Sequence, residues 1–182
     1  EIKRILSFTL VSHIGYMIFG IGLASARGLS SAIFYTAHHI TIQTALFLVV
    51  GLIERIGGST SIDRLGRLAT ASPALAALFF VPAMNLAGIP PMSGFVGKLG
   101  LLTAGLESGT PLAWALVAGS VVTSLLTLYA MAKIWSRSFW ADPIEGAPPP
   151  PTAVRLPILQ TTTAMAMVAV TLLIAVFVVM LT

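Results

Sequence analysis

Long apolar segments separated by short polar stretches follow one another along the chain. Residues 5–24 and 32–53 each contain about twenty residues without a charged side chain, which is enough helix to cross the roughly 30 Å hydrocarbon core of a bilayer. Further apolar segments cover residues 74–104, 111–135 and 156–182. The pattern predicts an all-α, polytopic membrane helix bundle with about five transmembrane helices.

The third apolar segment, 74–104, is too long for one straight span and contains adjacent prolines. Pro90 and Pro91 remove two backbone donors and disfavour helix at the residue before each. They lie between Gly88 and Gly94, so we expect two half-helices joined by a hinge at these residues. Because non-helical backbone at membrane depth persists only where protein or enclosed water satisfies it, the broken, discontinuous helix should lie inside the bundle.

The polar stretches predict loops rather than soluble domains. Arg27 with its neighbouring glycine and serines predicts a short turn, and residues 57–72 predict an extramembrane loop with a short interfacial turn. Residues 136–155 include a run of prolines and predict an extended linker. We therefore expect residues 1–182 to form part of one transmembrane domain, and the chain to be a piece of a longer polypeptide.

Charge is scarce and unevenly placed. The chain is 57% hydrophobic and 9% charged, far from the composition of soluble domains. With five spans, most basic residues fall on one side of the membrane, and only Arg27 falls on the other. The residues on the first side are Lys3, Arg4, Arg55, Arg64, Arg67, Lys133, Arg137 and Arg155. The positive-inside rule makes that side cytoplasmic, which predicts a multi-pass plasma-membrane protein whose N-terminal end is cytoplasmic.

The composition excludes several classes of function. Because cysteine is absent, there can be no disulfide, thiolate metal site or cysteine-ligated iron–sulfur cluster. The scattered basic residues form no nucleic-acid-binding stripe, and the serines and glycines form no nucleophile elbow or phosphate loop. We expect no cofactor, no metal, no nucleic-acid partner and no soluble-enzyme activity.

Lys98 is the one charged residue within the apolar segment 74–104. An ammonium in the bilayer costs roughly 3 kcal/mol or more, so such residues face a protein interior or a water-filled cavity. The alternative is that Lys98 snorkels towards the interface. About two apolar turns follow Lys98 before Glu107, which favours a buried proton carrier.

The second span carries His38, His39 and Gln43. His39 and Gln43 are four residues apart and share one helical face, whereas the adjacent histidines point in different directions and cannot both line one path. A histidine facing hydrated interior can pass protons, which makes His39 a candidate, and a structural bond to another helix is the alternative, favoured for His38. His13 in the first span could serve packing or transport.

Hydroxyl side chains recur on one face of the fourth span. Ser120, Thr123, Ser124 and Thr127 have the spacing of a single helical face, which suits close helix packing or, alternatively, a hydrated lining. The aromatic and basic side chains of residues 133–140 predict an interfacial anchor.

Four motifs in order resemble a known family. They are EIKRILSFTLVSHIGYMIFGIGL, HHITIQTALFLVVG, MNLAGIPPMSGFVGKLGLL and LTLYAMAKIWSRSFW. Together they resemble the antiporter-like subunits shared by respiratory complex I and the Mrp-type multisubunit Na+/H+ antiporters, with most similarity to the D-type subunits of the Mrp branch. The resemblance extends from Glu1 to about Trp140 and implies the C-terminal part of a longer subunit built from inverted repeats.

The resemblance also implies roles for individual residues. Lys98 matches the buried lysine of the family's broken helix, and His39 matches the histidine of its proton path. Gln43 stands where the family commonly has a lysine, and glutamine can orient water but cannot carry a charge. The residues and the resemblance together give Lys98, His39, Gln43 and His13 as the candidate proton pathway, with Lys98 and His39 as the members that the resemblance implies.

We therefore expect a membrane-embedded subunit of a monovalent cation (Na+)/proton antiporter, a secondary transporter and not an enzyme. Its expected partners are other subunits of the antiporter complex, the lipid bilayer, and protons and Na+ as transported ions. Two alternatives stay open. One is an antiporter-like proton-pumping subunit of a complex I-type NADH:quinone oxidoreductase, and the other is a non-conducting membrane scaffold.

Overall fold

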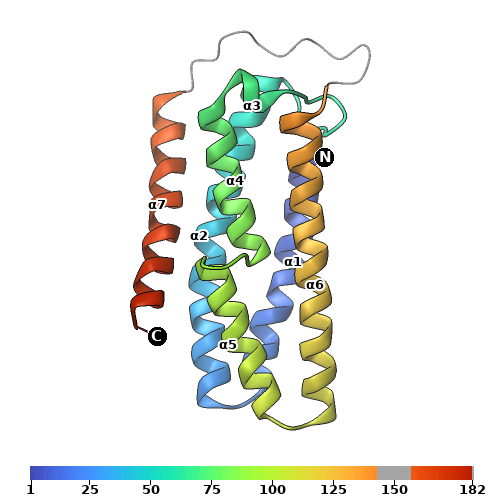
Figure 1. The fold of residues 1–182 in the computed structure, drawn as a ribbon, viewed down its shortest axis with the longest axis vertical. Coiled ribbons are helices and arrows are strands. Elements are labelled where there is room, and N and C mark those ends of the chain that lie inside the picture. The colour runs from blue at the N-terminus through green and yellow to red at the C-terminus, as the bar shows by residue number, and fades with distance from the viewer. Residues whose placement is uncertain (143–156, 182) are drawn as a thin grey trace.

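The computed structural model describes residues 1–142 and 157–181, and every described element is helical. The helices are α1 (Ile2–Gly22), α2 (Ala26–Gly57), α3 (Leu68–Ala71), α4 (Pro73–Ala87), α5 (Ser93–Glu107), α6 (Pro111–Trp135), the π-helical turn η1 (Ser136–Trp140) and α7 (Ile158–Leu181). The long helices lie side by side in one bundle, and α4 and α5 follow each other along its length (Figure 1). The predicted all-α membrane helix bundle is confirmed.

Three of the described helical stretches are long and apolar enough to cross a membrane. They are Ile2–Gly22, Ala26–Gly57 and Pro111–Trp140, and the shorter apolar helices are Pro73–Ala87 and Ile158–Ile174. Because α4 and α5 are stacked end to end (Figure 1), they together provide the length that neither has alone.

The proline-broken helix is present. α4 ends at Ala87, and Gly88 follows with a left-handed φ of 87°. Its backbone N–H donates to the carbonyls of Met84 and Asn85, at 3.1 and 3.0 Å, which is a common way to end a helix at glycine. A cis Pro90–Pro91 peptide follows, and α5 begins at Ser93.

Two helix boundaries differ from the expected ones. The predicted turn at Arg27 is wrong, because α2 already begins at Ala26, where the Ser25 side chain accepts a hydrogen bond from the Gly28 backbone N–H. An N-cap of this kind starts a helix even in a polar segment. Residues 136–140 were expected in the linker but form η1, because Phe139 is buried and stacks on Phe79 with ring centroids 5.1 Å apart. The remaining linker, with Arg155, lies outside the described residues.

Charged side chains gather at the two ends of the bundle. Lys3 on α1 pairs with Glu54 on α2 at 2.5 Å, close to the N-terminal end in Figure 1. At the opposite end, Arg27 on α2 pairs with Glu107 on α5. The described basic residues that were expected on one side belong to the ends of α1, α2 and α6, to η1 and to the α2–α4 connection. These segments all lie at the end of the bundle that carries the N-terminus (Figure 1).

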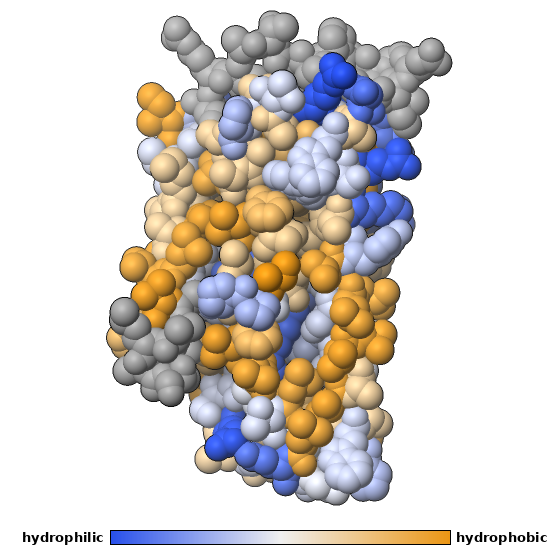
Figure 2. All heavy atoms as spheres, viewed as in Figure 1, coloured by the Kyte–Doolittle hydropathy of each residue, from blue (hydrophilic) through white to orange (hydrophobic). Residues whose placement is uncertain are grey.

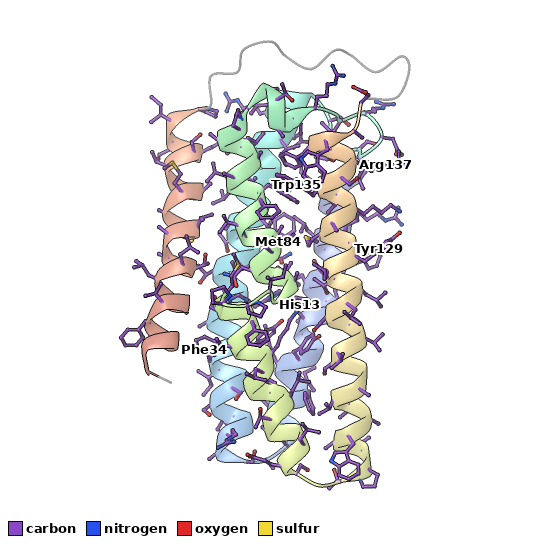
Figure 3. All side chains as sticks on the ribbon, in the orientation of Figure 1. His13, Phe34, Met84, Tyr129, Trp135 and Arg137 are labelled. Carbon is purple, nitrogen blue, oxygen red and sulfur yellow. The ribbon has the colours of Figure 1, made fainter. Side chains whose placement is uncertain are left out.

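Two apolar core clusters enclose a polar middle. The larger cluster includes Leu6, Ile42 and Leu46, and the smaller one includes Phe19 and Leu101. His13 on α1 and His38 and His39 on α2 lie between the two clusters in sequence, and Figure 3 labels His13 at mid-height in the bundle.

Candidate functional site

Lys98 lies inside the bundle at the helix break and not at its end. The residue is 5% exposed, and its Nζ donates hydrogen bonds to the carbonyl oxygens of Leu86 at 3.1 Å and Ala87 at 3.0 Å. These are the last carbonyls of α4, which carry the partial negative charge of a helix C-terminus. The break therefore supplies backbone acceptors that hold the ammonium.

Tyr16 connects Lys98 to α6. The ammonium nitrogen lies 5.5 Å from the centroid of the Tyr16 ring, within the range of a cation–π interaction. The Tyr16 hydroxyl donates to the carbonyl of Ser120 at 2.5 Å and lies 2.8 Å from Oγ of Ser124. The hydroxyl-bearing face of α6 thus faces the bundle interior at this level.

His13 is the most connected side chain of the site. It is fully buried on α1, with Nδ1 3.1 Å from the Tyr35 hydroxyl and 3.3 Å from Nδ1 of His39. Its Nε2 lies 3.3 Å from Oγ1 of Thr127 on α6. Because two Nδ1 atoms face each other, a hydrogen bond between them requires one ring to carry the proton there and the other to accept it. His13 therefore joins α1, α2 and α6 in one network.

His39 and Gln43 occupy one face of α2 but have different partners. The His39 ring stacks on Tyr35 and lies 4.9 Å from His13 between ring centroids. Gln43 donates from Nε2 to the carbonyl of Leu6 on α1 at 2.8 Å. Among the described residues, Nε2 of His39 and Oε1 of Gln43 are buried without a hydrogen-bond partner, and enclosed water would satisfy such atoms.

His38 belongs to a separate cluster at the break. Its Nδ1 lies 2.9 Å from Oγ of Ser93, at the start of α5. Asn85 on α4 contacts the same hydroxyl at 3.3 Å and accepts a hydrogen bond from the Gly94 backbone N–H at 2.9 Å. This cluster ties α2, α4 and α5 together, which matches the structural alternative for His38.

Replacing Asn85 with alanine should destabilise the break. The change leaves the buried Gly94 N–H without an acceptor, at a cost of about 1–3 kcal/mol. We expect a lower thermal unfolding temperature for the purified complex that contains the full-length subunit. Thr44→Ala is the control, because that hydroxyl is exposed and bonds only within its own helix. Equal effects of the two changes would contradict the role of Asn85.

Four side chains of the site did not stand out in the sequence, namely Tyr16, Tyr35, Asn85 and Ser93. A signal was present for both tyrosines, because Tyr16 follows His13 by three positions and Tyr35 precedes His39 by four, and such spacings place side chains on one helical face. No comparable signal marks Asn85 and Ser93, which meet only because the chain breaks between them. Within the described residues, no three His, Asp or Glu side chains are grouped as metal ligands.

The comparisons with known proteins agree with this architecture. The family model described as NADH:quinone oxidoreductase/Mrp antiporter, TM, matches residues 1–127. The D-type subunit of the Na(+)/H(+) antiporter of Alkalihalophilus pseudofirmus is 40% identical over 142 residues, which cover 78% of this chain and 28% of that protein. NADH-quinone oxidoreductase subunit N 2 of Opitutus terrae is 34% identical over 173 residues, which cover 95% of this chain and 35% of that protein.

A solved structure is similar over almost the whole chain. The structure of the Mrp complex from Dietzia sp. contains a chain that is 34% identical, with a TM-score of 0.85 over 97% of this chain and 40% of that one. The chain thus spans less than a third of the length of the antiporter relative from A. pseudofirmus, at 28%. These matches confirm the resemblance seen in the four motifs, and the chain belongs to the NADH:quinone oxidoreductase/Mrp antiporter transmembrane family.

Proposed function

We propose that this chain is part of a membrane-embedded subunit of a multisubunit Na+/H+ antiporter, and that it moves protons through Lys98, His13 and His39. The observation that supports this most directly is the buried series of contacts from Lys98 through Tyr16 and His13 to His39. A scaffold that only packs helices together has no need for a buried ammonium and a histidine pair in one polar interior, since each is costly to bury.

The roles of the groups follow from their chemistry. A histidine can accept a proton on one ring nitrogen and release one from the other, so the facing Nδ1 atoms of His13 and His39 can exchange a proton directly. Lys98 reaches this pair only past the Tyr16 ring, and a bridging water has to complete the path. A protonated Lys98 also repels a proton on His13 or His39 because both would carry positive charge. Lys98 and the histidine pair are therefore protonated alternately and not at the same time. Gln43 orients water beside His39.

The setting of the subunit is part of the proposal. The relative from A. pseudofirmus carries the name of an antiporter subunit, and the similar structure is an Mrp complex. We infer that the partners are further antiporter subunits and lipid, that the chain is a transporter component and not an enzyme, and that it lies in the plasma membrane. The basic end of the bundle, which carries Lys3 and Arg137, would face the cytoplasm.

A complex I-type subunit is the second candidate, because the Opitutus terrae relative named NADH-quinone oxidoreductase subunit N 2 matches 95% of the chain. The two candidates differ in the driving reaction. An antiporter moves protons in response to an imposed Na+ gradient, whereas a complex I-type subunit moves them only while partner subunits oxidise NADH. Vesicles that contain the complete complex, given a Na+ gradient without NADH, separate the two.

Replacing His39 or His13 with glutamine in the full-length subunit should slow Na+-dependent proton transport by about tenfold or more, because a positioned proton-transfer group contributes that much or more. Glutamine retains hydrogen bonding but cannot carry the proton. The measurement is the decay of a pH gradient in vesicles after Na+ addition. Thr44→Ala on α2, the helix of His39, is the control and should leave the rate unchanged. A wild-type rate and pH dependence in both histidine variants would assign the pair to packing.

A further inference from the structure

The C-terminal end of α4 presents two backbone oxygens to a single cation. We call the carbonyl oxygens of Leu86 and Ala87 the carbonyl seat. Lys98 places its ammonium on the carbonyl seat with distances of 3.1 and 3.0 Å. Because the last carbonyls of a helix lack intrahelical donors and carry partial negative charge, they attract any small cation that reaches them.

No carboxylate holds the ammonium in place among the described residues. The titratable groups that face Lys98 are Tyr16 and His13 on α1 and His38 and His39 on α2, and from α6 Ser124 lines the same cavity. Near neutral pH all of these side chains are ordinarily uncharged, and a histidine becomes charged only when it takes up a proton. The ammonium is therefore held by neutral oxygens and a ring, and another monovalent cation could replace it without breaking an ion pair.

A cavity of about 190 Å³ lies beside the carbonyl seat. Lys98, Ser124 and the backbone at Ala87 and Gly88 line it on one side, and the other lining side chains are apolar, namely Phe95, Leu99, Leu102, Val121 and Leu125. A hydrophilic area is visible between α5 and α6 at mid-height in Figure 2. Since a water molecule occupies about 30 Å³ of liquid volume, the cavity can hold water beside the seat. A Cβ added at Gly88 would come within 3.0 Å of Cδ and 3.3 Å of Nζ of Lys98, so glycine leaves the approach open.

We propose that the carbonyl seat is a Na+ site, occupied in this structure by the Lys98 ammonium, and that Na+ binds there when Lys98 is neutral and moves aside. Half-helix C-terminal carbonyls and unwound backbone coordinate Na+ in other transporters, and cavity water supplies the remaining ligands. Na+ and the protonated Lys98 ammonium exclude each other because both bind the carbonyl oxygens of Leu86 and Ala87. The inference rests on the proposed antiport and gives it a place where the two ions compete.

The test measures binding of radioactive 22Na+ to the purified complex containing the full-length subunit, in lipid nanodiscs, with choline chloride keeping the ionic strength constant. In the wild type, the apparent Na+ affinity should rise about tenfold per pH unit in the range where Lys98 is still protonated before Na+ binds, because each Na+ then displaces one proton, and should level off once Lys98 is neutral. Lys98→Met keeps the stem without the competing charge, so Na+ should bind equally well at low and high pH. Lys98→Arg keeps its charge at every pH and should abolish this binding.

Lys133→Met is the matched control, because Lys133 is exposed on α6, and it should bind Na+ as the wild type does. The proposal is wrong if Lys98→Met retains the wild-type pH dependence, or if Lys98→Arg binds Na+ like the wild type. If the Lys98→Met variant fails to assemble, the pH dependence of Na+ binding in the wild type and the Na+ binding of Lys98→Arg still test the proposal. If Lys98→Met blocks proton transport but leaves Na+ binding unchanged, the seat is refuted while the relay stands, whereas unchanged transport and binding refute both.

Discussion

Replacing Lys98 with alanine in the full-length subunit is expected to lower Na+-dependent proton transport by about a hundredfold or more, because a positioned proton-transfer group is removed. The change also leaves the carbonyls of Leu86 and Ala87 without their shared donor. That loss should cost about 1–3 kcal/mol of stability. Proton flux in vesicles under an imposed Na+ gradient gives the rate, and thermal unfolding of the purified complex gives the stability.

Two further variants separate the structural effect from the effect on transport. Lys98→Arg retains a cation for the carbonyls of α4 but cannot release its proton. It should be closer to wild type in stability than Lys98→Ala and equally poor in transport. Lys133→Ala removes an exposed lysine from α6 and should preserve both properties. If Lys98→Ala assembles normally and transports at the wild-type rate, Lys98 is no relay and the scaffold alternative gains its strongest support.

The break in the third span could be predicted because its causes are local in sequence. Pro90, Pro91 and Gly88 each act on their own or the neighbouring backbone, so the end of α4 and the start of α5 follow from the residues themselves. The start of α2 was harder to predict. Arg27 and the serines after it suggested a turn before a span that begins at residue 32, but Ser25 caps a helix that already begins at Ala26. The helix therefore extends through polar residues beyond the apolar part of the span.

The candidate site could be predicted only in part, because its contacts join distant positions. His39 and Lys98 stood out from their apolar surroundings, whereas His13 offered no reason to choose transport over packing. Its partners Tyr35, His39 and Thr127 lie 22, 26 and 114 positions away, and no local pattern reports such distances. This matters for Gln43, where the resemblance led us to expect a lysine, since the side chain within 3.3 Å of Nδ1 of His39 is His13 on α1 and not a lysine on α2.

Replacing Gly94 with alanine is expected to lower both stability and transport, because α4 and α5 approach each other closely at this residue. A Cβ added at Gly94 would overlap the backbone carbonyl of Asn85 and lie 3.0 Å from Nε2 of His38. A backbone carbonyl cannot turn aside as a flexible side chain can, so α5 must shift away from α4. Overpacking of this kind costs about 1–3 kcal/mol, and the shift also weakens the hydrogen bond from the Gly94 N–H to Asn85.

The expected result for Gly94→Ala is a lower unfolding temperature of the complex, together with reduced transport, because Lys98 lies one turn further along α5. Gly51→Ala on α2 is the matched control, since a Cβ there meets nothing within 4 Å. That change should be neutral or slightly stabilising, because alanine favours helix over glycine by roughly 1 kcal/mol. Equal stability of the two variants would mean that the half-helices can separate at no cost. In that case the packing of α4 on α5 would not keep the carbonyls of Leu86 and Ala87 within hydrogen-bond distance of the Lys98 ammonium, and the proposed position of Lys98 would be unsupported.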